Sequence, residues 1–546
     1  MAERTGVTRI PVLRRWNLSP RESAILAAIV LVTIAIYLPS LRNGWVFDDW
    51  DIFVTNKILH SWSFVWNSLF RDKFWFRNPA RLPQSEYYRP VESTYIAASA
   101  LLLGTHPAAW HLSKIVLHVI TVVLCFRVAQ LLSGSVGIGL LTAAIYGVMP
   151  AHVDAVVWLS AISEPLSTAF ELGALLWLIG RQPGWSRGML CALGLYACAQ
   201  LTHESAILFP LVVAAYVFLF ERGANQQLPG PSQNAGTIRS RIIAAARVSA
   251  PFGALALAYL CARLAVLGLH FAFSWPRPTG PVHLGQMASP APHRPVDFIL
   301  TMPVVLLTDL GVLAVPGVAG PVHAVHWITR ASPIAFVAAG VFVILAAAAL
   351  VLVWRSSDRR LYLFCAVWSL LALAPALKLN SIWELVQDRY LYAPSFGWSL
   401  AVAVAAVRLA AASPRARAAV GTAMALLLAA YMVTAIRIEH YWRDDVSFFG
   451  QCLAVDPTNL DYRLDLVIAM NKAGDFEGAA QALERGTAIH PNNAVLQKDL
   501  AQQYQKMGRQ LDFAREFRKF IKLSNAAAQR QRAAESSDAS QPASAP

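Results

Sequence analysis

Three carboxylates lie within four positions of the sequence, in the first polar stretch that follows an apolar segment. They are Asp48, Asp49 and Asp51, and aromatic residues stand on both sides of them. Carboxylates this close raise one another's pKa or hold a cation, and either behaviour suits a general base or a metal site. A divalent ion at Asp48, Asp49 and Asp51 is an option that the spacing leaves open. The other option is a solvated acidic loop between interfacial tryptophans.

A second group of candidate residues is cationic. Arg89 lies in the run Tyr88-Arg89-Pro90, and His111 and Lys114 begin an apolar stretch further along the chain. Cationic side chains of this kind bind phosphate well. Each of them alone also fits a side chain that extends its charged end to the membrane surface.

Further candidates stand where other apolar segments begin or end. His152 and Asp154 mark one boundary, and Glu164 follows, roughly 15 Å beyond Asp154 if the segment between them is helical. An intramembrane carboxylate is a candidate functional residue, unless it only pairs with a Lys or Arg of another helix. Two similar polar pairs occur later in the chain, namely His203-Glu204 and Asp388-Arg389. The sequence contains no Walker A, HExxH or CxxC motif.

The elements that must hold these residues are membrane helices. Of the 546 residues, 56% are hydrophobic and 14% are charged, and the mean hydropathy is +0.46, whereas a soluble domain is about 25% charged. The composition therefore predicts an all-α polytopic protein surrounded by membrane lipids. The six cysteines fit buried apolar positions. In a membrane protein, the net charge of +14 is expected to come from basic loops on the cytoplasmic side. No nucleic-acid partner is therefore expected.

Basic residues indicate the topology. Residues 1–21 carry five arginines, so the positive-inside rule places this N-terminus in the cytoplasm. The next segment is predicted to be an uncleaved anchor. The later arginine clusters all fall on the cytoplasmic side only if segments 91–104 and 297–316 lie along the outer face. About eleven spans are then expected in residues 22–437, with loops 40–110 and 269–333 and the C-terminus external.

Residues 438–525 predict a separate external module of helical repeats. Several pairs of residues are 34 positions apart, among them Gly474 and Gly508, and Leu466 and Leu500. This period, with small residues at helix contacts, is the signature of tetratricopeptide repeats. A glycine at each turn lets the chain reverse. Such repeats bind peptides or pack on other domains, and the Ala-, Ser- and Gln-rich residues 526–546 are expected to be disordered.

Several blocks of the sequence resemble one known family. In chain order they are Asn43-Gly44-x-x-x-Asp48-Asp49, Tyr88-Arg89-Pro90, Trp110-His111-Leu112, Pro150-x-His152-Val153-Asp154-Ala155-Val156-x-Trp158 and Asp388-Arg389-Tyr390-x-Tyr392-x-Pro394-Ser395. Together with the C-terminal repeats, they resemble the transmembrane and tetratricopeptide-repeat-containing O-mannosyltransferases and their bacterial relatives. The blocks cover nearly the whole chain in the order of that family.

The resemblance implies a GT-C glycosyltransferase fold and a sugar donor linked to a polyprenyl phosphate. The acceptor is expected to be a hydroxyl group, most readily a protein Ser or Thr, on the external face, and a single displacement inverts the anomeric centre. The catalytic carboxylate is then Asp48 or Asp49. We expect Arg89, Lys114, His203 and Arg389 at the lipid phosphate, and His111, His152, Asp154, Glu164 and Glu204 at the sugar or the acceptor.

Two positions depart from the family pattern. The family usually has Lys where this chain has His203, and often an Arg where it has Ile162. Both changes remove positive charge from the expected phosphate site, so other cations compensate, the donor differs, or the activity is weaker. Two alternative functions remain: a transferase acting on a glycan or lipid, and a non-enzymatic membrane scaffold whose repeats bind partners. The Ala- and Arg-rich composition predicts a bacterial inner membrane, with the external face in the periplasm.

Overall fold

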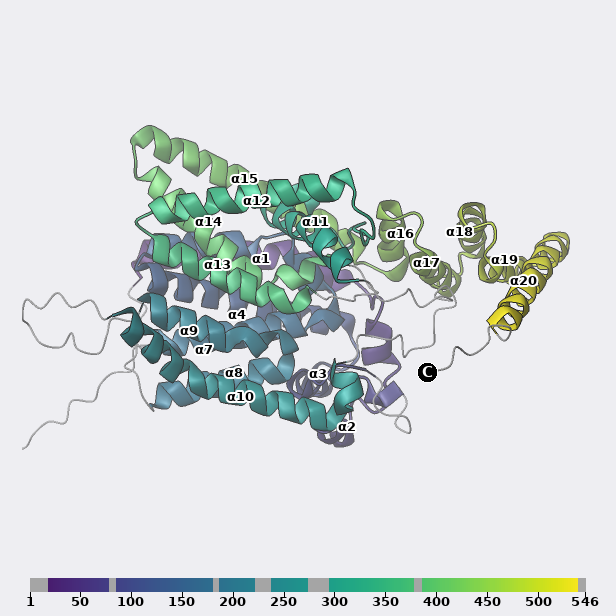
Figure 1. The fold of residues 1–546 in the computed structure, drawn as a ribbon, viewed down its shortest axis with the longest axis horizontal. Helices are drawn as coiled ribbons and strands as arrows, with labels where there is room; N and C mark the ends of the chain where they lie inside the picture. The colour runs from purple at the N-terminus through teal and green to yellow at the C-terminus, as the bar shows by residue number, and fades with distance from the viewer. Residues whose placement is uncertain are drawn as a thin grey trace, which may run out of the picture. The chain divides into compact units, whose positions relative to one another are not determined.

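The computed structural model describes residues 18–77, 85–179, 186–220, 237–273, 294–377 and 385–538. All regular elements among these residues are helices (Figure 1). The chain forms two compact units. The first comprises Met1–Thr279 and Ala291–Arg443, and the second comprises Gly280–Pro290 and Asp444–Pro546.

The first unit is a bundle of membrane helices with short helices at its ends. Its α-helices are α1 (Pro20–Tyr37), α2 (Trp62–Ser68), α3 (Pro90–Leu103), α4 (Pro107–Ser133), α5 (Val136–Gly147), α6 (His152–Val157), α7 (Ser163–Leu178), α8 (Arg187–Thr202), α9 (Phe209–Phe220), α10 (Ile238–Phe273), α11 (Pro295–Ala314), α12 (Pro333–Arg355), α13 (Arg359–Leu373), α14 (Pro394–Ala410) and α15 (Pro414–Tyr441).

Local signals in the sequence set these boundaries. Proline in the first turn opens α3, α4, α12 and α14, where its missing N–H costs nothing. Gly134 ends α4 in the left-handed conformation, with φ +68°. Close packing then fixes the bundle: a Cβ on Gly397 of α14 would lie 2.5 Å from the carbonyl oxygen of Cys365 on α13. Only glycine allows these two helices to approach so closely.

The predicted class, an all-α polytopic membrane protein, is confirmed. Among the described residues, seven helices are long and apolar enough to cross a membrane, and these are α1, α4, α10, α11, α12, α13 and α15. The count of eleven spans stays a prediction. Helix α3, with 14 residues, is short for a span, as expected for 91–104. Helix α11 has 20 residues and is among the seven, so its length does not support the prediction that 297–316 lies flat.

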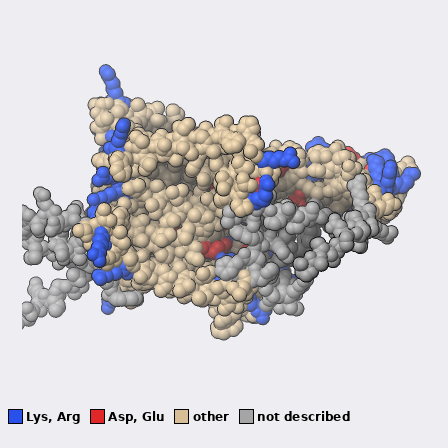
Figure 2. Space-filling model, viewed as in Figure 1, with Lys and Arg blue, Asp and Glu red and all other residues tan. Residues whose placement is uncertain are grey.

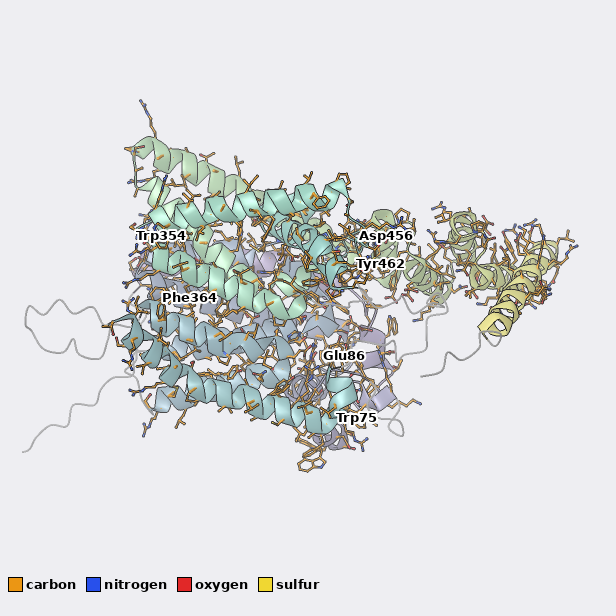
Figure 3. All side chains as sticks on the ribbon, in the orientation of Figure 1. Trp75, Glu86, Trp354, Phe364, Asp456 and Tyr462 are labelled. Atoms are coloured by element: carbon orange, nitrogen blue, oxygen red, sulfur yellow. The ribbon has the colours of Figure 1, made fainter. Side chains whose placement is uncertain are left out.

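The two ends of the bundle differ in charge. Lys and Arg side chains gather along one end of the first unit (Figure 2). Trp354 lies near that end, whereas Glu86 and Trp75 lie near the other (Figure 3). This asymmetry agrees in pattern with basic loops on one membrane face. The direction of the bundle across the membrane, and loops 40–110 and 269–333 as external segments, remain predictions. Residues 274–293 of the second loop lie outside the described residues.

The second unit consists of antiparallel helices α16 (Asp445–Val455), α17 (Leu460–Lys472), α18 (Phe476–Ile489), α19 (Ala494–Lys506) and α20 (Gln510–Asp538). Helices α17 and α19 begin 34 residues apart, as do α18 and α20. The turn residues Gly474 and Gly508 have φ of +81° and +74°, which favours glycine. Leu466 and Leu500, one period apart, are both buried. Helix α20 continues to Asp538, past residue 526 where disorder is expected; residues 539–546 lie outside the described residues.

Candidate active site

One cavity in the first unit collects charged side chains from segments that are distant in sequence. Loop 38–89, the start of α7, the turn after α8, the end of α13 and the segment before α14 all contribute to its wall. Its volume is about 150 Å³. The charged residues and histidine that line it are Asp48, Lys73, Arg89, Glu164, Glu171, His203, Glu204 and Arg389. Six of the twelve residues predicted for the site therefore lie in one wall: Asp48, Arg89, Glu164, His203, Glu204 and Arg389.

The two adjacent acids Asp48 and Asp49 point in different directions. Asp48 lines the cavity, and its side chain is 35% exposed. Asp49 is buried. Its carboxylate accepts hydrogen bonds from the Ser160 hydroxyl at 2.5 Å, the Ser160 N–H at 2.8 Å and the Val46 N–H at 3.1 Å. Asp48 is therefore placed to meet a ligand, whereas Asp49 ties the loop to the segment before α7.

Both acids have raised pKa values. Burial raises the pKa of Asp48 above its usual range, although Arg77 and Lys73 oppose this. Burial raises the pKa of Asp49 to about 7 despite its hydrogen bonds to Ser160 and Val46. A carboxylate with a raised pKa is a better proton acceptor than an ordinary one near neutral pH. Of the two, only Asp48 has access to the cavity.

Arg89 forms the most complete ion pair of the site. Its Nε and Nη2 donate to both carboxylate oxygens of Glu204, at 2.8 and 2.7 Å. Its Nη1 donates to the Ser163 hydroxyl at 3.2 Å and lies 3.6 Å from Glu92. Burial strengthens such a bidentate pair. Arg89 therefore locks the start of α3 to the turn after α8.

Arg389 is held less tightly. Its Nη1 lies 3.4 Å from Asp154 and its Nε 3.8 Å from Glu164. The guanidinium also stacks over the Trp158 ring, 4.7 Å from its centroid. Burial raises the pKa of Asp154 to about 6 although Arg389 lowers it. Asp154, Glu164 and Trp158 thus hold this guanidinium at the cavity wall.

His203 and Glu164 face each other across the cavity. The Nε2 of His203 lies 3.7 Å from Glu164, and its Nδ1 lies 2.6 Å from the Ser205 hydroxyl. Ser163 donates to the other oxygen of Glu164 at 2.9 Å. Ile162 is fully buried, so this position contributes packing. The positive charge near Glu164 comes instead from Arg389.

Other predicted site residues lie outside the cavity wall. His111 and Lys114 are buried on α4. The Nζ of Lys114 has no hydrogen-bond partner among the described residues, and the carboxylates that act on it are those of Glu164, Asp49, Glu92 and Asp154. Asp154 reaches the cavity only through Arg389. His152 is buried elsewhere, with its Nε2 2.7 Å from the Ser395 hydroxyl.

The three acids of the first loop do not converge. Asp51 pairs with Arg77 at 2.7 Å, Asp49 binds Ser160, and Asp48 faces the cavity. Within the described ranges, no group of three or more His, Cys, Asp or Glu side chains is arranged to hold a metal ion. The structure therefore does not bring Asp48, Asp49 and Asp51 together as ligands.

Three residues of the site, Lys73, Ser160 and Glu171, were not predicted. Lys73 lines the cavity and pairs with the fully buried Glu92 at 2.8 Å. Ser160 anchors Asp49. Glu171 lines the cavity and is hydrogen-bonded to Ser167 at 3.2 Å. One signal was present in the sequence: Ser163, Ser167 and Glu171 recur every four residues, which places them on one face of α7.

Comparison with known proteins agrees with this architecture. A family model described as tetratricopeptide repeat matches residues 446–509. The protein O-mannosyl-transferase TMTC3 of Mus musculus is 32% identical over 148 residues, which are 27% of this chain and 16% of that protein. The protein O-mannosyl-transferase Tmtc3 of Drosophila melanogaster is 25% identical over 90% of this chain and 57% of that protein. The resemblance inferred from the sequence is confirmed.

The chain spans 57% of the length of the Drosophila relative. Among solved structures, the oligosaccharyltransferase of Archaeoglobus fulgidus is similar over 81% of this chain and 59% of that chain. The identity is 12% and the TM-score is 0.39, too low to establish a shared fold.

Proposed function

We propose that this protein is a membrane glycosyltransferase that moves a sugar from a polyprenyl-phosphate donor to an acceptor hydroxyl. The observation that carries the proposal is the single cavity that holds an accessible carboxylate, Asp48, together with Arg89 and Arg389. A base and anion-binding cations are the two requirements of such a transfer. The similarity to protein O-mannosyl-transferases supports the same reaction class, with mannose as the first sugar to test.

In the proposed step, the acceptor oxygen attacks the anomeric carbon and its proton passes to Asp48. The bond between that carbon and the phosphate oxygen breaks, and polyprenyl phosphate leaves with the electron pair. One displacement inverts the anomeric centre. Arg389, which lines the cavity beside Glu164, is the cation that we assign to the leaving phosphate. Asp49 acts as a positioning residue, because its bonds to Ser160 fix the loop that carries Asp48.

His203 does not replace the charge of the family lysine in this proposal. It faces Glu164 at 3.7 Å, but burial, with the charge of Arg89, lowers the pKa of its imidazole, which favours the neutral form. Arg89 is already paired with Glu204 on two sides. Arg389 and Lys73 therefore supply the remaining positive charge of the wall. Lys114 contributes from behind that wall, through its field on the buried carboxylates.

The tetratricopeptide unit favours a protein acceptor over a glycan or lipid acceptor, since such repeats present a groove for extended peptides. Truncation after Arg443 tests this role. This position preserves two contacts of the first unit. The Trp442 ring still stacks on the Trp158 ring, with 5.7 Å between the centroids, and the Arg443 carbonyl still accepts a hydrogen bond from the Gly44 N–H at 3.0 Å. The expected result is a raised KM for a full-length acceptor and little change for a short hydroxyl acceptor. Equal losses on both would remove the recognition role.

We place the cavity and the repeats on the external face, which is the periplasm if the chain comes from a bacterial inner membrane. The reaction class is tested by mass spectrometry of external proteins and glycolipids from cells with the wild-type gene, with a deletion, and with Asp48→Asn. Hexose on protein Ser or Thr that is lost in both altered strains is the expected result. A change confined to glycolipids or polysaccharide would redirect the acceptor. Identical glycosylation profiles in all three strains would contradict the transferase function and favour the alternative of a non-enzymatic membrane scaffold.

A further inference from the structure

The segment between α11 and α12 packs against the short turn that carries Arg389. This turn is a 3-10 helix, Asp388–Leu391. The Nε2 of His323 lies 2.6 Å from one carboxylate oxygen of Asp388, and the N–H of Gly320 donates to the other oxygen at 2.8 Å. The side chains are 9% and 2% exposed. Gly320 and His323 thus bind both carboxylate oxygens of Asp388. His323 and Asp388 are 65 residues apart in the sequence.

The clamped residue stands directly before Arg389. Arg389 reaches Asp154 and Glu164 from the same turn. The position of its guanidinium therefore depends on two sets of contacts: Asp154 and Glu164 at the cavity, and the His323 pair with Asp388 behind it. A one-turn helix has few hydrogen bonds of its own, so these side chains must hold it.

The groups that face His323 are all acidic. Asp388 is in direct contact, and the charges of Asp309 on α11 and Asp154 on α6 also act on the imidazole. Asp309 is buried. Three carboxylates around one imidazole favour its protonated form.

We infer that His323 is a positioning residue that holds Asp388, keeps Arg389 directed into the cavity, and thereby makes donor binding depend on pH. This inference rests on the proposed function, because Arg389 is there the ligand of the donor phosphate. The argument stands on the two contacts to Asp388 and on the adjacency of Asp388 and Arg389.

The direction of the pH effect follows from the charges. Burial disfavours the imidazolium, but its hydrogen bond to Asp388 and the surrounding acids outweigh burial, so the pKa of His323 is raised above its usual range. The ion pair is therefore complete between the pKa of Asp388 and that of His323, and it weakens as the pH rises through the raised pKa of His323. Burial raises the pKa of Asp388 too, so the pair is also lost when Asp388 becomes protonated in acid.

The test measures KM for a polyprenyl-phosphate sugar and kcat between about pH 5.5 and pH 9, in four full-length proteins: wild type, His323→Gln, His323→Lys and the control His326→Gln. His326 lies on the same segment and is exposed. In wild type and the control, KM should rise on the alkaline side. In His323→Gln, KM should be about tenfold higher at low pH and nearly flat. In His323→Lys, which stays cationic, KM should be low and flat.

Three results would overturn the inference: His323→Gln with the wild-type profile, an equal loss of kcat at every pH with KM unchanged, or an alkaline rise that persists in His323→Lys. If His323→Gln does not accumulate in membranes, Asp388→Asn takes its place, because it keeps the geometry and removes the charge. It should also abolish the alkaline rise, and retention of that rise counts against the inference. Absence of transfer by the wild type would instead contradict the proposed function.

Discussion

Two polar clusters in the first unit differ in composition and in structure. The cavity cluster consists of Asp48, Arg89, Glu164, His203 and Arg389, and it opens to a space that a ligand can enter. The aromatic cluster consists of His118, Tyr146, His152 and Tyr392, all fully buried. The four aromatic rings lie 4.3–6.0 Å apart.

The difference lies in how the polar atoms are used. In the aromatic cluster, Tyr392 OH lies 2.7 Å from His118 Nδ1, and Tyr146 OH donates to the Tyr392 carbonyl at 3.0 Å. These contacts join α4, α5 and the segment before α14 through fully buried side chains. In the cavity cluster, charged groups remain beside open space. Buried neutral networks specify a fold, whereas charges held at an opening can act on a substrate.

The largest effect should come from Asp48→Asn. The change removes the base at the cavity and preserves the size of the side chain, so kcat should fall by about 10²–10⁴-fold with a nearly unchanged KM for the donor. Initial rates with purified protein measure this. Asp475→Asn is the matched control, because Asp475 is an exposed acid of the second unit that caps α18, and Asn caps helices equally well. A full rate in Asp48→Asn would assign the chemistry to another group.

Arg389→Ala should have the next largest effect. Loss of charge-assisted contacts to the donor phosphate should lower kcat/KM by about 10²-fold, chiefly through KM. The control is Arg408→Ala. Arg408 lies in the last turn of α14 and forms a bidentate pair with Asp358 at 2.7 and 2.8 Å. Equal losses in the two variants would indicate a general effect of charge removal.

Asp49→Asn should alter the pH dependence of the thermal midpoint and should have only a small effect on the rate of transfer. The pKa of Asp49 is about 7 in the fold and about 3.9 in an unfolded chain, so its ionisation favours unfolding as the pH rises from about 4 to about 7. The thermal midpoint of Asp49→Asn relative to wild type should therefore be higher at about pH 8 than at about pH 5. The rate should fall only about tenfold, since Asn still accepts from Ser160. A difference in midpoint that is independent of pH would show that Asp49 does not titrate in this range.

His152→Phe should have the smallest effect on transfer. The aromatic ring is kept while the bond to Ser395 is lost, at a cost of about 1–3 kcal/mol in stability. Thermal unfolding in detergent measures this cost, and kcat/KM should stay within about threefold of wild type. A large loss of transfer at full stability would place His152 in the reaction and blur the distinction between the two clusters.

The sequence predicted the helical class and the repeats because both depend on local periodicity. Apolar runs predict membrane helices, and the 34-residue period predicts the turns at Gly474 and Gly508 with their positive φ. The location of segment 297–316 was harder to predict. Its expected position along the outer face followed only from the arginine clusters in other loops. Its length as α11 does not support that inference.

The site was predicted in part. His152 and Asp154 belong to one sequence block, yet they lie two positions apart on a short helix, so their side chains point to different surroundings. His152 reaches Ser395 in the aromatic cluster and Asp154 reaches Arg389. Lys73 and His323 were missed because their partners, Glu92 and Asp388, are 19 and 65 residues away. Only tertiary structure brings such partners together.

The most direct test of the central claim is a transfer reaction with purified protein. An isotopically labelled polyprenyl-phosphate mannose is incubated with a peptide rich in Ser and Thr, and the configuration of the new glycosidic bond is determined by NMR. The account predicts labelled peptide in which the anomeric configuration of the donor is inverted. Label that enters the peptide with retained configuration, or no label from the lipid donor in a correctly folded protein, would contradict it.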